Sequence, residues 1–219
     1  MLSLCGVSLR LAGEPFLENV DLKIERGHIY GFCGLDSMQS SALFGVLAGT
    51  LLPQSGHVTL SDLPLDEAAP FLKDRIGLIP QKLPSFAPVT VKEQLAFMLE
   101  AYGLRAAAQA ERIRELLELS MLTGAENKLC QGLSFSEKRR LVIAQAMAGP
   151  LDYALFEMPF NNIDPHSSIC IKKLMRTIAQ TGAVALSCEP TREMFALCDV
   201  IYTLQEGRFV AISEVMQTG

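Results

Sequence analysis

The sequence lacks an excess of positive charge. It has 19 Lys and Arg against 24 Asp and Glu in 219 residues, which gives a formal net charge of −5. A dedicated nucleic-acid binder normally presents a basic face to the phosphates. The only tight basic cluster is Lys138, Arg139 and Arg140, so we expect no nucleic-acid partner.

Long apolar runs and compact cysteine motifs are also missing. No apolar run reaches the roughly 18 to 20 residues that span a bilayer, and the first residues lack the basic and apolar segments of a signal peptide. The six cysteines show neither C-x-x-C spacing nor a disulfide framework, which favours reduced thiols in a cytosolic protein. We find no internal repeat, so the length predicts one domain.

Short β-branched or apolar runs alternate with helical patterns, which predicts an α/β fold with a mostly parallel sheet. Turn-like segments at 12–14 and 54–56 flank the first, second and fourth strands and indicate an antiparallel edge layer. Between Pro84 and Gly132 no strand is evident, and apolar spacing predicts helices over 91–102 and 107–119. The expected strands are 2–7, 20–24, 29–33, 57–60, 76–79, 153–156, 183–186, 200–204 and 208–211.

The most informative stretch is IYGFCGLDSMQSSA, residues 29–42. An apolar strand runs into Gly34, a polar loop and a helix-like segment, which is the layout of a phosphate-binding loop. In G-x-x-x-x-G-K-[ST], backbone N–H groups cradle the phosphates, the Lys reaches the β/γ oxygens and the hydroxyl holds Mg²⁺. Here Gln39 stands for the second Gly and Ser40 for the Lys, and only the hydroxyl remains, as Ser41.

The motifs that follow resemble, in their order, the nucleotide-binding subunit of an ABC transporter. DRIGLIPQ places Gln81 at the Q-loop, and VTVKEQLAFMLEAYGL resembles the helical subdomain of compact exporter-type subunits. Three later segments also resemble family motifs. The signature and its helix are matched by LSFSEKRRLVIAQAMAGP, the Walker B strand and D-loop by ALFEMPFNNIDP, and the switch region by LSCEPTREMFALCDVIYTLQEGR. The resemblance implies a P-loop NTPase-like fold in a single domain, with a core at 1–83 and 133–219 and a helical subdomain at 84–132.

Within the loop itself, several residues depart from that family's pattern. Asp36 stands where the family often has Asn, and Ser37 and Gln39 replace glycines. Loss of the Lys at Ser40 forfeits ~4 kcal/mol for a cation about 4 Å from a phosphate at an effective dielectric of about 20. The alternative is that residues 34–41 form only a polar strand-to-helix turn, with Ser40 or Ser41 capping the helix. We favour this alternative over a working ATP site.

The other catalytic positions implied by the resemblance are also altered. Glu157 stands at the Mg²⁺-organising Asp, and Met158 stands at the general base, where it cannot accept a proton. Glu189 occupies the position of the switch His that hydrogen-bonds the γ-phosphate. Leu11 occupies the position of the aromatic residue that stacks on adenine.

The signature loop bears on pairing, because subunits of this family pair head to tail and hold each ATP between one P-loop and the partner's signature. Phe135 and Ser136 replace its glycines, while Ser134 keeps its hydroxyl. Ser134 and Glu137 also form a capping-box pattern that needs no ligand. In the D-loop, Asp164 followed by Pro is a helix start as well as an interface position.

The sequence therefore predicts a degenerate nucleotide-binding subunit, a pseudo-ATPase located in the cytoplasm on the inner face of the cell membrane. Its expected partners are transmembrane permease subunits and a second nucleotide-binding subunit, in a homo- or heterodimer. ATP and Mg²⁺ are weak candidate ligands, with Ser41, Gln81 and Glu157 at the metal positions. Two alternatives stay open: a weakly active ATPase or ATP binder, and an interaction module outside transport.

Overall fold

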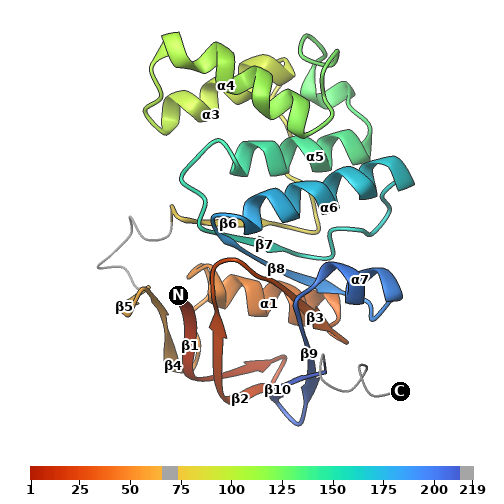
Figure 1. The fold of residues 1–219 in the computed structure, drawn as a ribbon. Coiled ribbons are helices and arrows are strands. Elements are labelled where there is room, and N and C mark those ends of the chain that lie inside the picture. The colour runs from red at the N-terminus through yellow and green to blue at the C-terminus, as the bar shows by residue number, and fades with distance from the viewer. Residues whose placement is uncertain (66–73, 213–219) are drawn as a thin grey trace.

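The computed structural model of the chain describes residues 1–65 and 74–212. Its strands form two sheets, and helices lie between the sheets and beyond the larger one (Figure 1). Within these two ranges, no helix is both long enough and apolar enough to cross a membrane.

The smaller sheet is antiparallel, with strand order β2-β1-β4-β5, which confirms the predicted edge layer. The turn between β1 and β2 falls at Ala12 and Gly13, which both have positive φ. The turn expected at 54–56 is wrong, because β4 already begins at Ser55. Gly56 is needed for close approach: a Cβ there would lie 2.4 Å from the carbonyl oxygen of Gly6 on β1. The strands are β1 (Leu2–Leu11), β2 (Glu14–Ile24), β4 (Ser55–Leu60) and β5 (Leu63–Pro64).

The larger sheet has strand order β10-β9-β3-β8-β7-β6. All neighbours are parallel except β10, which pairs antiparallel with β9, so the predicted mostly parallel sheet is confirmed. The strands are β3 (Ile29–Cys33), β6 (Ile76–Ile79), β7 (Tyr153–Phe156), β8 (Ala183–Cys188), β9 (Val200–Gln205) and β10 (Arg208–Ala211). The carboxyl ends of parallel strands share one edge of a sheet, so the loops after β3, β7 and β8 lie close together.

The helices divide the apolar core into two clusters. Helix α1 lies between the two sheets (Figure 1) and buries every residue from Ala42 to Leu47, as expected for a helix apolar on all sides. On the other face of the larger sheet lie α5 and α6, with α3 and α4 stacked beyond α5. The helices are α1 (Ser37–Leu47), α3 (Val91–Ala101), α4 (Ala106–Leu119), α5 (Phe135–Ala146), α6 (Pro165–Ala179) and α7 (Arg192–Leu197), with a short 3-10 turn at Cys130–Gly132.

The two helices predicted between Pro84 and Gly132 are confirmed to within one residue at each end. In this segment, which the structure describes in full, there is no strand, only an isolated bridge between Thr90 and Leu129.

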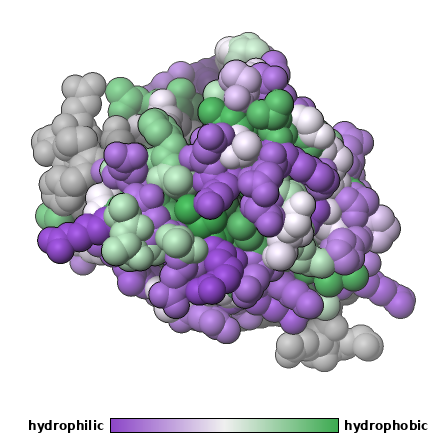
Figure 2. Space-filling model, turned by 90° about the horizontal axis from the view of Figure 1, so that it is seen from above, coloured by the Kyte–Doolittle hydropathy of each residue, from purple (hydrophilic) through white to green (hydrophobic). Residues whose placement is uncertain are grey.

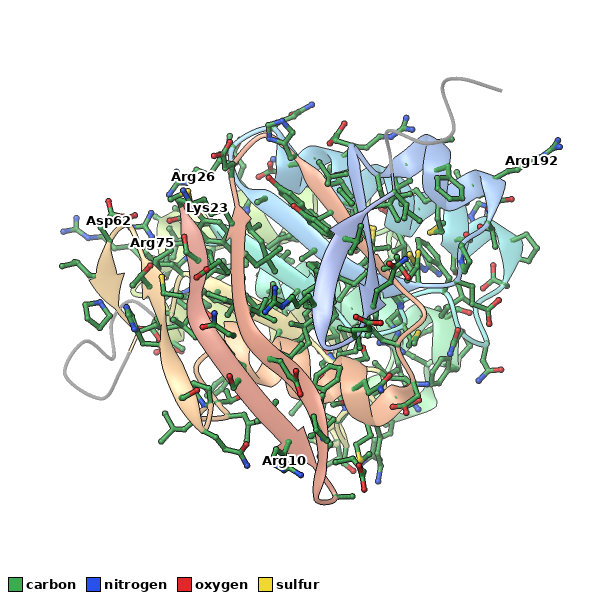
Figure 3. The ribbon with its side chains drawn as sticks, turned by 90° about the horizontal axis from the view of Figure 1, so that it is seen from below. Arg10, Lys23, Arg26, Asp62, Arg75 and Arg192 are labelled. Carbon is green, nitrogen blue, oxygen red and sulfur yellow. The ribbon has the colours of Figure 1, made fainter. Side chains whose placement is uncertain are left out.

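At the amino ends of the parallel strands, one carboxylate fixes several elements. Asp152, just before β7, pairs with Arg26 at 2.5 Å and with Arg75, and the two arginines lie near each other at one side of the sheets (Figure 3). The carbonyl of Asp152 also accepts a hydrogen bond of 2.8 Å from Ala183, the first residue of β8. This network holds the strands in register at the edge of the sheet opposite the loops that follow β3, β7 and β8.

Candidate functional site

The loop after β3 is closed by its own carboxylate. Gly34 turns the chain at a φ of 79°, and Asp36 then caps α1. The backbone N–H of Gln39 donates to Asp36 Oδ1 at 2.8 Å, and the backbone N–H of Asp36 donates to the side-chain oxygen Oε1 of Gln39 at 3.1 Å. The prediction that Ser40 or Ser41 caps this helix is wrong, because α1 begins at Ser37 and Asp is as effective an N-cap as Ser.

This cap changes what the loop can bind. The free N–H groups and dipole at a helix N-terminus favour an anion, and here the Asp36 carboxylate already accepts from one of these groups, the backbone N–H of Gln39. The amide of Ser40 is also bonded, to the carbonyl of Asp36 at 2.9 Å. A phosphate group would have to compete with a negative charge that belongs to the chain.

Ser40, predicted to stand at the position of the Lys, is fully buried. Its Oγ lies 2.6 Å from Ser187 Oγ, and the Ser187 hydroxyl also accepts a hydrogen bond of 2.9 Å from the Met158 amide. The first turn of α1 and the loop after β7 are thus joined through a side chain of β8. Ser187 was missed by sequence reasoning because the predicted strand ended at residue 186, whereas β8 continues to Cys188 and includes it.

The three positions predicted for a metal lie together. The carboxylate of Glu157, only 6% exposed, accepts hydrogen bonds on Oε2 from Ser41 Oγ at 3.0 Å and from the backbone N–H of Gln81 at 3.1 Å. Hydroxyl, amide and carboxylate oxygens suit Mg²⁺, although Glu157 Oε2 already has two donors. The three residues border a cavity of about 560 Å³ whose other lining residues include Lys82, Phe135 and Arg139.

Arg139 was singled out in the sequence only as part of a basic cluster, yet its side chain is fully buried. Its guanidinium donates to the carbonyl of Gln81 at 2.7 Å and to the carbonyl of Pro80. The ring of Phe135 lies over it, 5.5 Å from centroid to guanidinium carbon. Burial lowers the pKa of Arg139, and the charge of Glu157 opposes that shift. Arg139 therefore fixes the backbone that presents Gln81 to Glu157.

The signature segment begins α5 with the predicted capping box, which is confirmed. The Glu137 amide donates to Ser134 Oγ at 3.2 Å, and the Ser134 amide donates to Glu137 Oε2 at 2.8 Å. That backbone bond lowers the pKa of Glu137. Phe135 is 43% exposed, whereas Ser136 is buried, so the two residues in place of the signature glycines have different surroundings.

Ser136 connects the signature to the D-loop, since its hydroxyl accepts a hydrogen bond of 3.2 Å from the Asp164 amide. Asp164 is the N-cap of α6, as predicted, with Pro165 at the first helical position and the Ser167 amide donating to Asp164 Oδ1 at 2.8 Å. The Ser167 amide, together with the hydroxyls of Ser136 and Ser167, strongly lowers the pKa of Asp164.

The predicted switch position lines a cavity next to the Glu157 cavity, and Asn161 lines both. Glu189 is exposed directly after β8 and lines, with Met158, a second cavity of about 500 Å³. Arg192, the first residue of α7, extends away from the molecule (Figure 3). Leu11, predicted to stand at the position of the residue that stacks on adenine, lies half-buried at the end of β1 and lines neither cavity.

Comparison with known proteins decides the family. Residues 17–161, more than half of the chain, match the family described as ABC transporter. The chain belongs to the ABC transporter family. The predicted resemblance to an ATP-binding subunit and the predicted P-loop NTPase-like fold are confirmed.

Two curated relatives of this ABC-family chain illustrate the match. The chain is 29% identical over 206 residues to the lipopolysaccharide export system ATP-binding protein LptB of Escherichia coli, covering 91% of this chain and 84% of the relative. It is 32% identical over 183 residues to the energy-coupling factor transporter ATP-binding protein EcfA1 of Thermotoga maritima, covering 83% and 69%.

Solved structures agree on the fold. The chain is similar to an ATP-binding subunit of an ABC transporter, with a TM-score of 0.85 at 21% identity over 99% of this chain and 92% of the other. It is also similar to cbiO1 of Clostridium perfringens, with a TM-score of 0.83 at 21% identity over 95% and 86%.

Proposed function

We propose that this ABC-family chain is a nucleotide-binding subunit that does not hydrolyse ATP and instead supports or regulates transport. The observation that carries the proposal is the Asp36 cap, which places a carboxylate where a phosphate would lie. The buried Ser40 adds to it, since its hydroxyl is bonded to Ser187 and offers no charge to a ligand.

The electrostatic effect on ATP binding is large. Two unit charges about 4 Å apart interact by ~4 kcal/mol at an effective dielectric of about 20. The chain loses one such attraction at Ser40 and gains one repulsion at Asp36. Half of that total weakens ATP binding more than about a hundredfold. These residues do not fit a triphosphate, so we assign no step of hydrolysis to them.

The position of the general base supports the same proposal. A thioether cannot take a proton from water, and general acid–base assistance typically contributes about 10²–10⁴ in rate. The Met158 amide is bonded to Ser187, which fixes this backbone without offering a proton acceptor. Glu189 presents a negative charge at the switch position.

We propose transmembrane permease subunits and a second nucleotide-binding subunit, identical or not, as the partners, and the inner face of the cell membrane as the location. We also propose that residues 84–132 form the helical subdomain that docks on the permease. Large hydrophobic side chains are exposed on this segment: Phe97 is 66% exposed and Leu129 is 51% exposed. Figure 2 views this side of the molecule and shows hydrophobic side chains interspersed with hydrophilic ones.

The test compares the purified chain with a restored variant carrying Asp36→Asn, Ser40→Lys, Met158→Glu and Glu189→His. We expect no Mg²⁺-dependent turnover in the unchanged chain above a P-loop deletion control, and no change of melting temperature with ATP. Tight binding at ~100-fold saturation would stabilise the fold by about 2.7 kcal/mol. Because Lys at the buried position 40 can reduce stability, Asp36→Asn alone is measured too, and it should bind ATP more tightly than the unchanged chain.

Substantial turnover that restoration leaves unchanged would contradict the proposal. Recovery of the chain from membranes together with a polytopic protein supports the transport role. A monomeric pool without such a partner would support the interaction module instead.

A second candidate is an ATP binder that works with a competent partner subunit, and the convergence of Ser41, Gln81 and Glu157 on one cavity favours it. In that case Glu157→Gln should reduce Mg²⁺-dependent nucleotide binding in the presence of the partner. If the main proposal holds, this substitution leaves nucleotide binding unchanged.

A further inference from the structure

Three thiols lie together at the carboxyl ends of two neighbouring strands. Cys33 ends β3 and Cys188 ends β8, the two residues are partners in the parallel register, and their sulfur atoms lie 3.6 Å apart. Cys198 directly follows α7, and its sulfur lies near that of Cys188, since both sulfur atoms are within 3.5 Å of a Cβ built on Gly31. None of the three is in a disulfide.

The fold makes room for this thiol cluster at Gly31. A Cβ built on Gly31 would lie 3.0 Å from Cys198 Sγ and 3.5 Å from Cys188 Sγ. The sulfur atoms therefore occupy the space that a larger residue at position 31 would need. Among the described residues, no group of three or more His, Cys, Asp or Glu is placed to hold a metal ion, so covalent chemistry between the thiols is the remaining reactivity.

Cys33 and Cys188 have the backbone geometry for a disulfide. Neighbouring strands lie about 4.7–4.9 Å apart, within the range of about 4.4–6.8 Å that disulfides span between Cα atoms. Residues in register on parallel strands point to the same face of the sheet. Bond formation brings the sulfur atoms from 3.6 Å to bonding distance and the Cβ atoms to within about 3.5–4.5 Å of each other, so it requires side-chain rotation and a small local approach of the two strand ends.

We propose that Cys33 and Cys188 form a reversible disulfide under hydroperoxide stress, with Cys198 as the thiol that reacts first. Cys198 is half-buried, whereas Cys33 is 3% exposed and Cys188 is 6% exposed. The inference goes beyond the proposed function and does not depend on it.

The reaction balances in three steps. The Cys198 sulfur attacks a hydroperoxide oxygen, the O–O bond breaks, an alcohol or water leaves with the thiol proton, and a sulfenic acid remains. The Cys188 sulfur attacks the Cys198 sulfur, and the hydroxyl group leaves as water with the Cys188 proton. The Cys33 sulfur then attacks Cys188, which forms the final disulfide and returns Cys198 to a thiol with the proton from Cys33.

The surroundings of the two buried thiols explain why a third is needed. A hydrogen bond with Cys188 and burial raise the pKa of Cys33. The neighbouring Cys198 thiol, together with burial, raises the pKa of Cys188 to about 12. Thiolate is the reactive form, so both buried thiols are weak nucleophiles, and their burial also keeps peroxide away from them. Their attack on a neighbouring sulfur needs no access from solvent, and proximity offsets the small thiolate fraction.

The disulfide would act on both loops of the candidate site. Cys33 directly precedes Gly34, and Cys188 directly precedes Glu189. A covalent bond between them joins the start of the P-loop to the start of the switch region, so relative movement of the two loops becomes restricted.

The experiment treats the reduced, folded full chain with hydrogen peroxide, blocks remaining thiols and maps tryptic peptides without reduction. Trypsin separates the three cysteines into peptides 27–73, 177–192 and 193–208. We expect a linked pair of the first two peptides, its loss on treatment with dithiothreitol, and a higher melting temperature in the oxidised form. Oxidation of Met38, which is 54% exposed, reports that the peroxide dose was sufficient.

Two variants test the order of reaction. Cys198→Ala should form the linked pair at least tenfold more slowly, whereas Cys5→Ala, on the other sheet, should form it at the unchanged rate. A folded chain with oxidised Met38 and no linkage between the first two peptides would overturn the proposal without any variant. Formation at the unchanged rate in Cys198→Ala would overturn the role of Cys198.

Discussion

Replacing Ser187 by Ala tests whether the buried hydroxyl pair has a structural role. The Ser187 hydroxyl contacts Ser40 Oγ at 2.6 Å and accepts from the Met158 amide at 2.9 Å. Both Ser187 and Ser40 are completely buried, so water cannot replace the lost bonds. The substitution leaves two polar groups unpaired, the Ser40 hydroxyl and the Met158 amide.

Each unpaired buried group costs about 1–3 kcal/mol, so Ser187→Ala, which leaves two of them, should lower the free energy of unfolding by about 2–6 kcal/mol. Ser40→Ala alone leaves the bond between Ser187 and Met158 intact and should cost about 1 kcal/mol. The double variant removes the unpaired Ser40 hydroxyl, so it should be no less stable than Ser187→Ala. The two effects are then non-additive by about 1 kcal/mol or more, as expected for groups in contact.

The matched control is Ser3→Ala. Ser3 is also buried, and its hydroxyl has no hydrogen-bond partner among the described residues, so its removal should change stability little. The chain has no Trp, so urea unfolding is followed by far-UV circular dichroism. Equal effects of Ser187→Ala and Ser3→Ala, or strict additivity with Ser40→Ala, would refute the structural role of the pair.

Three further outcomes are expected. Asp36→Ala should lower the free energy of unfolding by about 1 kcal/mol through loss of the α1 cap, and unchanged urea unfolding would contradict this. Arg139→Met leaves the carbonyls of Pro80 and Gln81 unpaired and should lower the free energy of unfolding by about 2 kcal/mol or more. Backbone amide exchange near Gln81 should become faster, and unchanged protection there would argue against the contact. The pKa of Asp164 is lowered in the fold, so its carboxylate stabilises the folded state. This contribution is complete above the pKa of an unfolded Asp, about 3.9, and declines as the pH falls below that value. The stability difference between the unchanged chain and Asp164→Asn should therefore shrink from pH 5 towards pH 2, and a constant difference would be evidence against it.

The strands were predictable where the local pattern was strong. Four strands of the larger sheet, β3, β6, β7 and β10, have the predicted bounds, because short apolar runs between turn residues suffice to define them. The antiparallel strands β1 and β2 run beyond their predicted ends. Gly6, inside β1, has a φ of 59°, and register shifts in the pairing with β2 let the strands continue past residues that local propensity disfavours.

The sequence also determined the family and the positions of the candidate residues, because the order and spacing of the motifs are properties of the chain alone. Through the family resemblance it also predicted that the Lys, the general base and the switch His are replaced, by Ser40, Met158 and Glu189. It also indicated the caps of α5 and α6, since Ser134 with Glu137, and Asp164 with Pro165, are local signals.

Tertiary structure alone decided how the altered residues are used. Ser40 and Ser187 are 147 positions apart, and Ser41 and Glu157 are 116 positions apart, so no local pattern predicts either contact. The burial of Arg139 and the meeting of Cys33 with Cys188 depend in the same way on strand order. Hydrogen bonding and burial act between atoms that are close in space, and only the packed sheet determines which distant residues those are.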